Sequence, residues 1–238
     1  EGGDSFGRSR ERFFEEYMIA CLSSRAPAGA WQSNQTRLPR RTSLLAMTEN
    51  MLSDYQFVYA VQRYVLDNPF TASSAVFAAR WLILIFAFIA VAFFVTHDRR
   101  LRHAAGEMVW SFLTALLVTN LVALFVLRER PFLQSPENLL SVRALIPPPI
   151  TTSFPSGHTA TAFALASAVF FVNRRLGIVA YLIALIIGFA RIAVGVHYPT
   201  DVVAGIFVGL ASFAAVRYCH ERLRARDMER AAKRHSHV

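Results

Sequence analysis

The sequence predicts an all-α membrane protein, a polytopic bundle of about five transmembrane helices preceded by an amphipathic helix. Hydrophobic residues make up 54% of its 238 residues, charged residues only 17%, and the mean hydropathy is +0.36. A soluble domain carries roughly a quarter charged residues, and twenty Phe exclude disorder of the whole chain. The two cysteines, Cys21 and Cys219, lie near opposite ends, which excludes a disulfide scaffold.

Five apolar segments are predicted to cross the membrane, and none contains more than one Asp, Glu, Lys or Arg: residues 74–95, 107–127, 157–172, 176–194 and 202–216. A helix needs roughly 20 residues to span about 30 Å of hydrocarbon. The third and fifth segments are short by this measure, so they are the weakest of the five predictions.

Residues 50–70 precede the first span and are too polar to cross a membrane. Their apolar side chains recur at helical spacing and would share one face of a helix: Phe57, Val58, Val61, Val65 and Leu66. Two interpretations are equally open, a helix lying on the membrane surface and a helix packed on the bundle.

The composition divides the chain into three parts. Residues 1–46 are polar, lack apolar periodicity and contain no signal-peptide pattern, so we expect a tail that is disordered or an extension. Residues 47–216 form the membrane domain. Residues 217–238 form a basic cytoplasmic tail, either a helix at the anionic inner leaflet or a solvated segment.

Basic residues gather on one side of the predicted topology. Loop 96–103 carries three Arg, loop 173–175 carries two, and the tail 217–238 carries seven basic residues against three acids. Short cytoplasmic loops are rich in Arg and Lys, so this side is predicted to be cytoplasmic and loops 128–156 and 195–201 external. The same bias explains the net charge of +9 without a nucleic-acid ligand.

The external side receives the residues expected of an anion site: Arg130, Ser156, Gly157, His158, Arg191, His197 and Asp201. A helix that begins near Ser156 offers free N–H groups to a phosphate, and Gly157 lets an oxyanion approach the backbone. Arginine forks bind phosphate oxygens. His197 and Asp201 are four residues apart, so the carboxylate can orient one imidazole nitrogen and leave the other free to attack.

Three motifs, in this order, resemble the signature of the type-2 phosphatidic acid phosphatase (PAP2) superfamily: Arg130-Pro131, Pro155-Ser156-Gly157-His158, and Arg191-x5-His197-x3-Asp201. The resemblance covers about residues 50–216 and is strongest to bacterial undecaprenyl-diphosphate phosphatases. It implies the PAP2 fold and hydrolysis of a lipid phosphate or diphosphate at the outer face of the bacterial plasma membrane. It implies no metal and no other cofactor, and no obligate protein partner is evident.

The resemblance also implies a role for each residue. His197 would be the nucleophile and form a phosphohistidine, Asp201 would orient it, and His158 would protonate the leaving oxygen. The phosphate would be bound by Arg130, Arg191 and the turn Ser156-Gly157.

Two positions depart from the family pattern. Ala123 stands where the family often has Lys, and we expect Arg128 to supply that charge; Ala190 stands where a Ser is usual. Thr119 and Asn120, within the second span, are interpreted as interhelical hydrogen bonders. Alternatives therefore stay open: phosphatidylglycerophosphate, phosphatidate or lipid A phosphate as the substrate, or a catalytically inactive membrane homologue.

Overall fold

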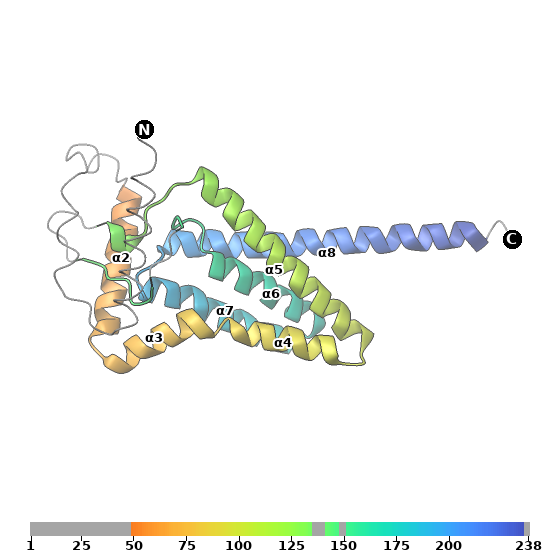
Figure 1. Ribbon diagram of the computed structural model, residues 1–238, viewed down its shortest axis with the longest axis horizontal. Helices are drawn as coiled ribbons and strands as arrows, with labels where there is room; N and C mark the ends of the chain where they lie inside the picture. The colour runs from red at the N-terminus through yellow and green to blue at the C-terminus, as the bar shows by residue number, and fades with distance from the viewer. Residues whose placement is uncertain (1–48, 135–140, 148–150, 236–238) are drawn as a thin grey trace, which may run out of the picture. The chain divides into compact units, whose positions relative to one another are not determined.

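The computed structural model describes residues 49–134, 141–147 and 151–235, so the predicted tail of residues 1–46 lies outside the described part. The described residues form helices and no strand, which confirms the predicted all-α class (Figure 1). The elements are α2 (Glu49–Leu66), α3 (Pro69–Trp81), α4 (Leu84–Val95), α5 (Arg99–Phe125), the 3-10 turn η1 (Pro131–Leu133), α6 (Gly157–Val172), α7 (Arg174–Ala193) and α8 (Pro199–His235).

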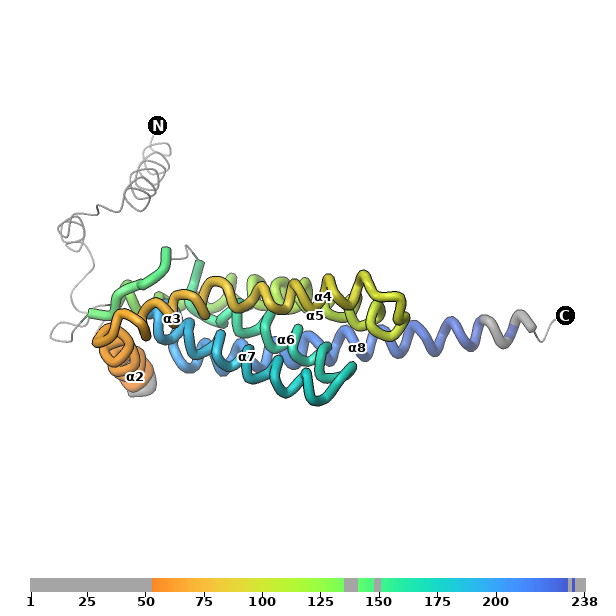
Figure 2. Tube along the Cα trace, turned by 90° about the horizontal axis from the view of Figure 1, so that it is seen from below, coloured from red at the N-terminus to blue at the C-terminus, as the bar shows by residue number. Residues whose placement is uncertain are grey.

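Four helical stretches in the described residues are long and apolar enough to cross a membrane: Pro69–Val95, Arg99–Phe125, Arg174–Ala193 and Pro199–Arg230. The short third predicted span is α6, a helix of 16 residues. It packs against α5, α7 and α8 (Figure 2). Its residues are buried from Thr159 to Val169. Protein therefore surrounds α6, which explains how so short an apolar helix is accommodated.

The first predicted span consists of two consecutive helices. Asn68 caps α3 by accepting a hydrogen bond from Phe70 N at 2.8 Å, and Pro69 occupies the first helical position, where its missing N–H is harmless. Between α3 and α4 the amides of Ile85 and Phe86 bond to carbonyls three residues earlier. The chain therefore turns tightly there without leaving its helical course.

Two helices extend beyond the predicted spans. α5 begins inside the predicted loop 96–103 because the Asp98 carboxylate caps it, accepting from Arg100 N at 2.8 Å. α8 continues without a break past residue 217 and projects beyond the other helices (Figure 1). At 1.5 Å per residue its 37 residues measure about 55 Å, more than the hydrocarbon thickness of about 30 Å.

α2 lies at the end of the bundle where α8 begins (Figure 1). Val58 and Val65 are buried as the pattern predicted, whereas Phe57 and Leu66 are 48% and 46% exposed. The buried face also holds a polar residue, Gln62, which the search for an apolar stripe overlooked.

Specific contacts hold α2 on the bundle. The Gln62 amide donates to the Arg143 carbonyl at 2.6 Å and accepts from Arg143 N at 2.7 Å. Tyr55 and Val58 belong to one buried cluster with residues of the α7–α8 region. These contacts favour the packed interpretation of the amphipathic segment.

Two glycines bring α8 close to α6. A Cβ at Gly205 would lie 2.7 Å from the Ser156 carbonyl oxygen, and one at Gly209 would lie 2.3 Å from the Ala160 carbonyl oxygen. Neither distance is possible for a real side chain, so the backbones approach this closely only because both residues are glycine. Ser156 N also donates to the Asp201 carbonyl at 3.0 Å. The starts of α6 and α8 are thereby fixed against each other.

Candidate active site

A pocket of about 180 Å³ lies at this end of the bundle. Its wall combines α5, the segment before α6, the start of α6 and the end of α7, and is lined by Leu116, Thr119, Asn120, Ala123, Arg130, Thr151, Thr152, Phe154, Pro155, Gly157, His158, Arg191 and His197. Five of the seven predicted site residues line it. The other two, Ser156 and Asp201, are fully buried next to it.

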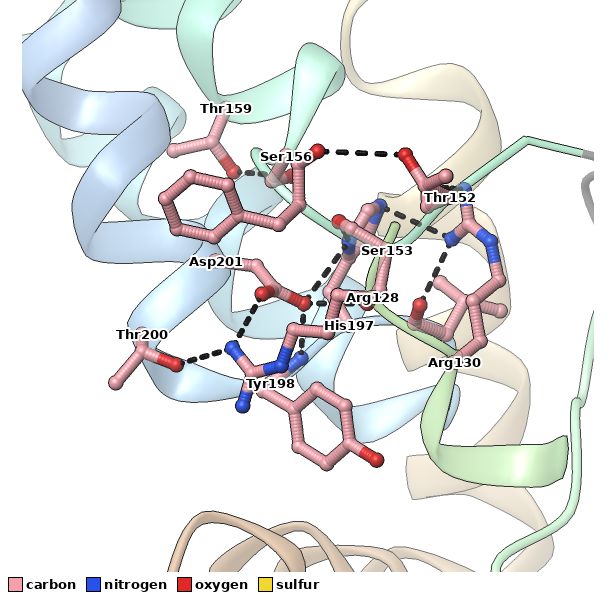
Figure 3. A network of polar contacts seen from close by, with 12 residues as sticks. Arg128, Arg130, Thr152, Ser153, Ser156, Thr159, His197, Tyr198, Thr200 and Asp201 are labelled. Carbon is pink, nitrogen blue, oxygen red and sulfur yellow. Dashed lines mark hydrogen bonds and ion pairs between the residues drawn. The ribbon is translucent and has the colours of Figure 1, made fainter. Parts of the chain in front are cut away.

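His197 has a defined tautomer. Its Nδ1 lies 2.8 Å from the carbonyl oxygen of Ser153, and because a carbonyl only accepts, Nδ1 carries the hydrogen (Figure 3). Nε2 therefore keeps its lone pair and lies 3.4 Å from Arg130 Nη1. Burial lowers the pKa of His197 to about 4, an effect that Asp201 opposes. The imidazole is thus neutral at pH 7, as a nucleophile requires.

Asp201 acts on His197 less directly than its spacing predicted. Its Oδ2 lies 3.5 Å from His197 Nδ1, but it accepts shorter hydrogen bonds from Ser153 Oγ at 2.5 Å and Tyr198 N at 2.9 Å. The carboxylate therefore holds Ser153, and the Ser153 carbonyl holds the imidazole. Sequence reasoning missed Ser153, whose only signal was its place three residues before Ser156.

Arg130 is largely occupied by the protein. Its guanidinium donates to the carbonyls of Thr151 at 2.9 Å, Thr152 at 3.0 Å and Val196 at 2.8 Å, and to the Thr151 hydroxyl at 3.1 Å. Arginine has five N–H donors, so about one is left, on the side that faces His197. Burial lowers the pKa of Arg130 to about 10, which leaves it charged at pH 7.

Arg191, unlike Arg130, has few of its donors used by the protein. It is buried, with 4% of its surface exposed, and among the described residues it makes one hydrogen bond, from Nη1 to the Ala79 carbonyl at 3.2 Å. Its Nε is buried without a partner among these residues. An unpaired buried donor costs about 1–3 kcal/mol, more for a charged group. Arg191 therefore brings unsatisfied positive charge to the pocket.

The start of α6 forms another part of the wall. A Cβ on Gly157 would meet only Thr119 Oγ1, at 3.9 Å, so protein packing does not demand glycine there. The absent side chain instead leaves room in the pocket beside the free N–H groups of the helix start.

The Ser156 hydroxyl is buried and lies 2.9 Å from Thr159 Oγ1. A ligand in the pocket would therefore meet the backbone of this turn and not the Ser156 hydroxyl.

Arg128 does not replace the missing lysine. Ala123 lines the pocket, whereas the Arg128 guanidinium lies beside Asp201, with Nη1 2.7 Å from Oδ1 (Figure 3). The interpretation of Thr119 and Asn120 is also corrected. Their side chains donate within their own helix, each at 2.8 Å, and both residues line the pocket.

The chain is similar to known membrane phosphatases. The family model of the PAP2 superfamily matches residues 104–225. Undecaprenyl-diphosphatase BcrC of Bacillus subtilis is 30% identical over 157 residues, which cover 66% of this chain and 79% of that protein. Lipid A 1-phosphatase of Rhizobium etli is 46% identical over 59 residues, 24% of this chain and 25% of that protein.

The fold has relatives of known structure. The crystal structure of a transmembrane PAP2-type phosphatidylglycerolphosphate phosphatase from Bacillus subtilis resembles this chain with a TM-score of 0.55 at 22% identity. The likeness covers 75% of this chain and 89% of that protein. The family match spans α6, α7 and every charged residue of the pocket, and we conclude that this chain belongs to the PAP2 superfamily.

Proposed function

We propose that this protein is a membrane phosphatase that hydrolyses undecaprenyl diphosphate to undecaprenyl phosphate and inorganic phosphate. The observation that carries the phosphate chemistry is Arg191, a buried guanidinium whose Nε has no partner among the described residues. It lines a pocket with two imidazoles and Arg130. The lipid is proposed from the similarity to undecaprenyl-diphosphatase BcrC along two thirds of the chain.

In the proposed reaction His197 Nε2 attacks the terminal phosphorus. The bond from phosphorus to the bridging oxygen breaks, and His158, which enters the step as an imidazolium, gives that oxygen a proton and becomes neutral as undecaprenyl phosphate leaves. Water then attacks the phosphohistidine and gives its proton to His158, which releases inorganic phosphate and restores both histidines. Arg191, the remaining donor of Arg130 and the backbone at Gly157 neutralise the phosphoryl oxygens. No metal takes part in these steps.

The proposed location is the bacterial plasma membrane, with the pocket on the external face and the C-terminus in the cytoplasm. The arginines near residues 99–102 and 174–175 lie at the ends of helices remote from the pocket along the chain, and the positive-inside rule assigns them to the cytoplasm. Undecaprenyl phosphate released on the outer face would return to cell-wall synthesis.

A second candidate is the same chemistry on another lipid. It is favoured by the local identity of 46% to a lipid A 1-phosphatase and by the phosphatidylglycerolphosphate phosphatase of similar fold. A third candidate is an inactive homologue, because Ala123 stands where the family often has a lysine.

Phosphate release from a lipid panel separates these functions. The purified protein in detergent is given undecaprenyl diphosphate, phosphatidylglycerophosphate, phosphatidate and a lipid A 1-phosphate, with His197→Ala as the control. We expect the highest kcat/KM for undecaprenyl diphosphate. A higher value for another lipid would replace the substrate, and no release from any lipid would make the protein an inactive homologue.

A further inference from the structure

Arg128 connects three separate segments of the chain. Its Nη1 donates to Asp201 Oδ1 at 2.7 Å and to Thr200 Oγ1 at 2.6 Å, both at the start of α8. Its Nη2 lies 2.9 Å from Asp54 Oδ2 on α2. The Arg128 side chain itself is 14% exposed and belongs to the segment that follows α5, which ends at Phe125.

Further contacts make this junction rigid. The Arg128 guanidinium stacks on the ring of Tyr198, 4.1 Å from its centroid, and Thr200 Oγ1 also donates to Asp54 Oδ2. The Arg128 carbonyl accepts from Ser153 N at 2.8 Å. Arg128 therefore contacts both groups that hold His197: the Asp201 carboxylate through its side chain, and Ser153 through its backbone.

The contacts of Arg128 lie on the side of His197 that faces away from the pocket. Neither Arg128 nor Asp54 lines the pocket, whereas Arg130, Arg191 and both histidines do. The Arg128 guanidinium forms ion pairs with the carboxylates of Asp54 and Asp201, so its positive charge is already balanced within the protein. These contacts are those of a positioning residue and not of a phosphate ligand.

We propose that Arg128 and Asp54 are positioning residues for the nucleophile, and that α2 is through them a part of the catalytic apparatus. Asp54 holds Arg128, Arg128 holds Asp201 and Ser153, and these hold the imidazole of His197. The inference rests on the proposed phosphatase function and deepens it, because it assigns a catalytic consequence to a helix outside the family match of residues 104–225.

The charges around His197 set the direction of the expected pH effect. His197 is faced by the Asp201 carboxylate, by the cations Arg130 and Arg191, and by His158. Without Arg128, the Asp201 carboxylate loses its closest positive charge. The carboxylate then attracts a proton on His197 more strongly, which raises the pKa of His197 and moves the acid limb of the kcat/KM profile to higher pH.

The test compares Arg128→Gln, Arg128→Lys and Asp54→Asn with the wild type on p-nitrophenyl phosphate and undecaprenyl diphosphate. For Arg128→Gln we expect kcat to fall on the order of 100-fold, because small displacements of a reacting group cost about this much. KM and the inhibition constant of inorganic phosphate, a four-coordinate ligand that needs no bond to His197, should change little. Arg128→Lys should restore the acid limb without restoring kcat, since lysine keeps the charge but lacks the planar fork.

Asp54→Asn isolates the contribution of α2. We expect a fall in kcat on the order of tenfold, and the double variant Asp54→Asn/Arg128→Gln should be no slower than Arg128→Gln alone, because both changes break the same chain of contacts. Asp67→Asn, an exposed acid just after α2, is the matched control and should behave as wild type.

The outcomes separate this inference from the proposed function. A wild type inactive on both substrates would overturn the function and the inference together. If the wild type is active, unchanged kcat in Arg128→Gln would overturn the inference alone. Inhibition by inorganic phosphate weakened as much as kcat would also overturn it, because Arg128 would then be a phosphate ligand. If Arg128→Gln fails to fold, Asp54→Asn decides: unchanged kcat and pH profile would reject the role of α2.

Discussion

His197 and His158 line the same pocket but stand in different surroundings. His197 is held through Nδ1 by the Ser153 carbonyl and is 3% exposed, whereas His158 lies in the first turn of α6 and is only partly buried. A fixed imidazole with a free lone pair suits attack on phosphorus. An imidazole at the rim beside the phosphate suits proton transfer to a leaving group.

This difference predicts that the two histidines fail differently. His197→Ala should be inactive on both a lipid phosphate and p-nitrophenyl phosphate, because no phosphoenzyme forms. His158→Ala should lose about 10²–10⁴-fold on a lipid monophosphate, whose alkoxide leaves poorly, and recover partly on the aryl ester. Steady-state rates on the two esters check the assignment. If His197→Ala keeps aryl phosphatase activity while His158→Ala loses it, the roles are exchanged.

Gly157 provides a test of the proposed phosphate cradle, which is the start of α6 with its free N–H groups at Gly157. Gly157→Ala meets no clash, so its melting temperature should equal or exceed that of the wild type, since replacing Gly at a compatible backbone stabilises by about 0.4–1 kcal/mol. The added methyl occupies pocket space, so kcat/KM should fall on the order of 10- to 100-fold. Gly106→Ala, with nothing within 4 Å of its Cβ, is the control and should keep full activity. Full activity of Gly157→Ala would mean that phosphate binds elsewhere.

The donor set also predicts independence from divalent cations. In the proposed mechanism two guanidiniums and a helix start neutralise the phosphate, so activity should survive excess EDTA, and vanadate should inhibit as a five-coordinate phosphate analogue. Phosphate release with EDTA, with vanadate and with added magnesium checks this. Strict dependence on magnesium would contradict the mechanism.

At the scale of the elements, the site depends on how closely α8 approaches α6. The Gly205 and Gly209 contacts bring the two backbones together, and Ser156 N and the Asp201 carbonyl join the helix starts. The cradle on α6 and the carboxylate on α8 are thereby held in register.

Gly209→Ala should therefore destabilise the bundle. Its methyl would lie 2.3 Å from the Ala160 carbonyl oxygen, so the helices must separate, and overpacking of this kind costs typically about 1–3 kcal/mol. We expect a lower melting temperature in detergent than for the wild type. Gly106→Ala serves again as the helical control. Equal melting temperatures of the two variants would mean that α6 and α8 are free to move apart.

At the scale of the whole molecule, the topology determines which side of the membrane the pocket faces. We expect the loop after η1 to be external and the C-terminus cytoplasmic. In a background with Cys21→Ser and Cys219→Ser, the single variant Ser135→Cys should react with an impermeant thiol reagent in intact cells, and Ser236→Cys should not. The reverse labelling would place the pocket on the cytoplasmic side.

The membrane class, the order of the helices and five of the residues that line the pocket could be predicted from the sequence. Apolar runs long enough to span a bilayer are a local property, and they predicted α3 to α8 although helix ends shifted, as at Asp98, where one cap decides. Arg130, Gly157, His158, Arg191 and His197 were also predicted, because the motifs that contain them are short and specific.

The partners of these residues were decided only by the tertiary structure. Ser153 and His197 are 44 residues apart, and Arg128 and Asp54 are 74 apart, so no local pattern records their contacts. A sequence shows that an arginine is present, but packing determines whether its donors are consumed, as in Arg130, or left unpaired, as in Arg191. Burial and hydrogen-bond geometry arise only once α2, α5, α6, α7 and α8 have come together, and they determine which groups remain free to bind phosphate.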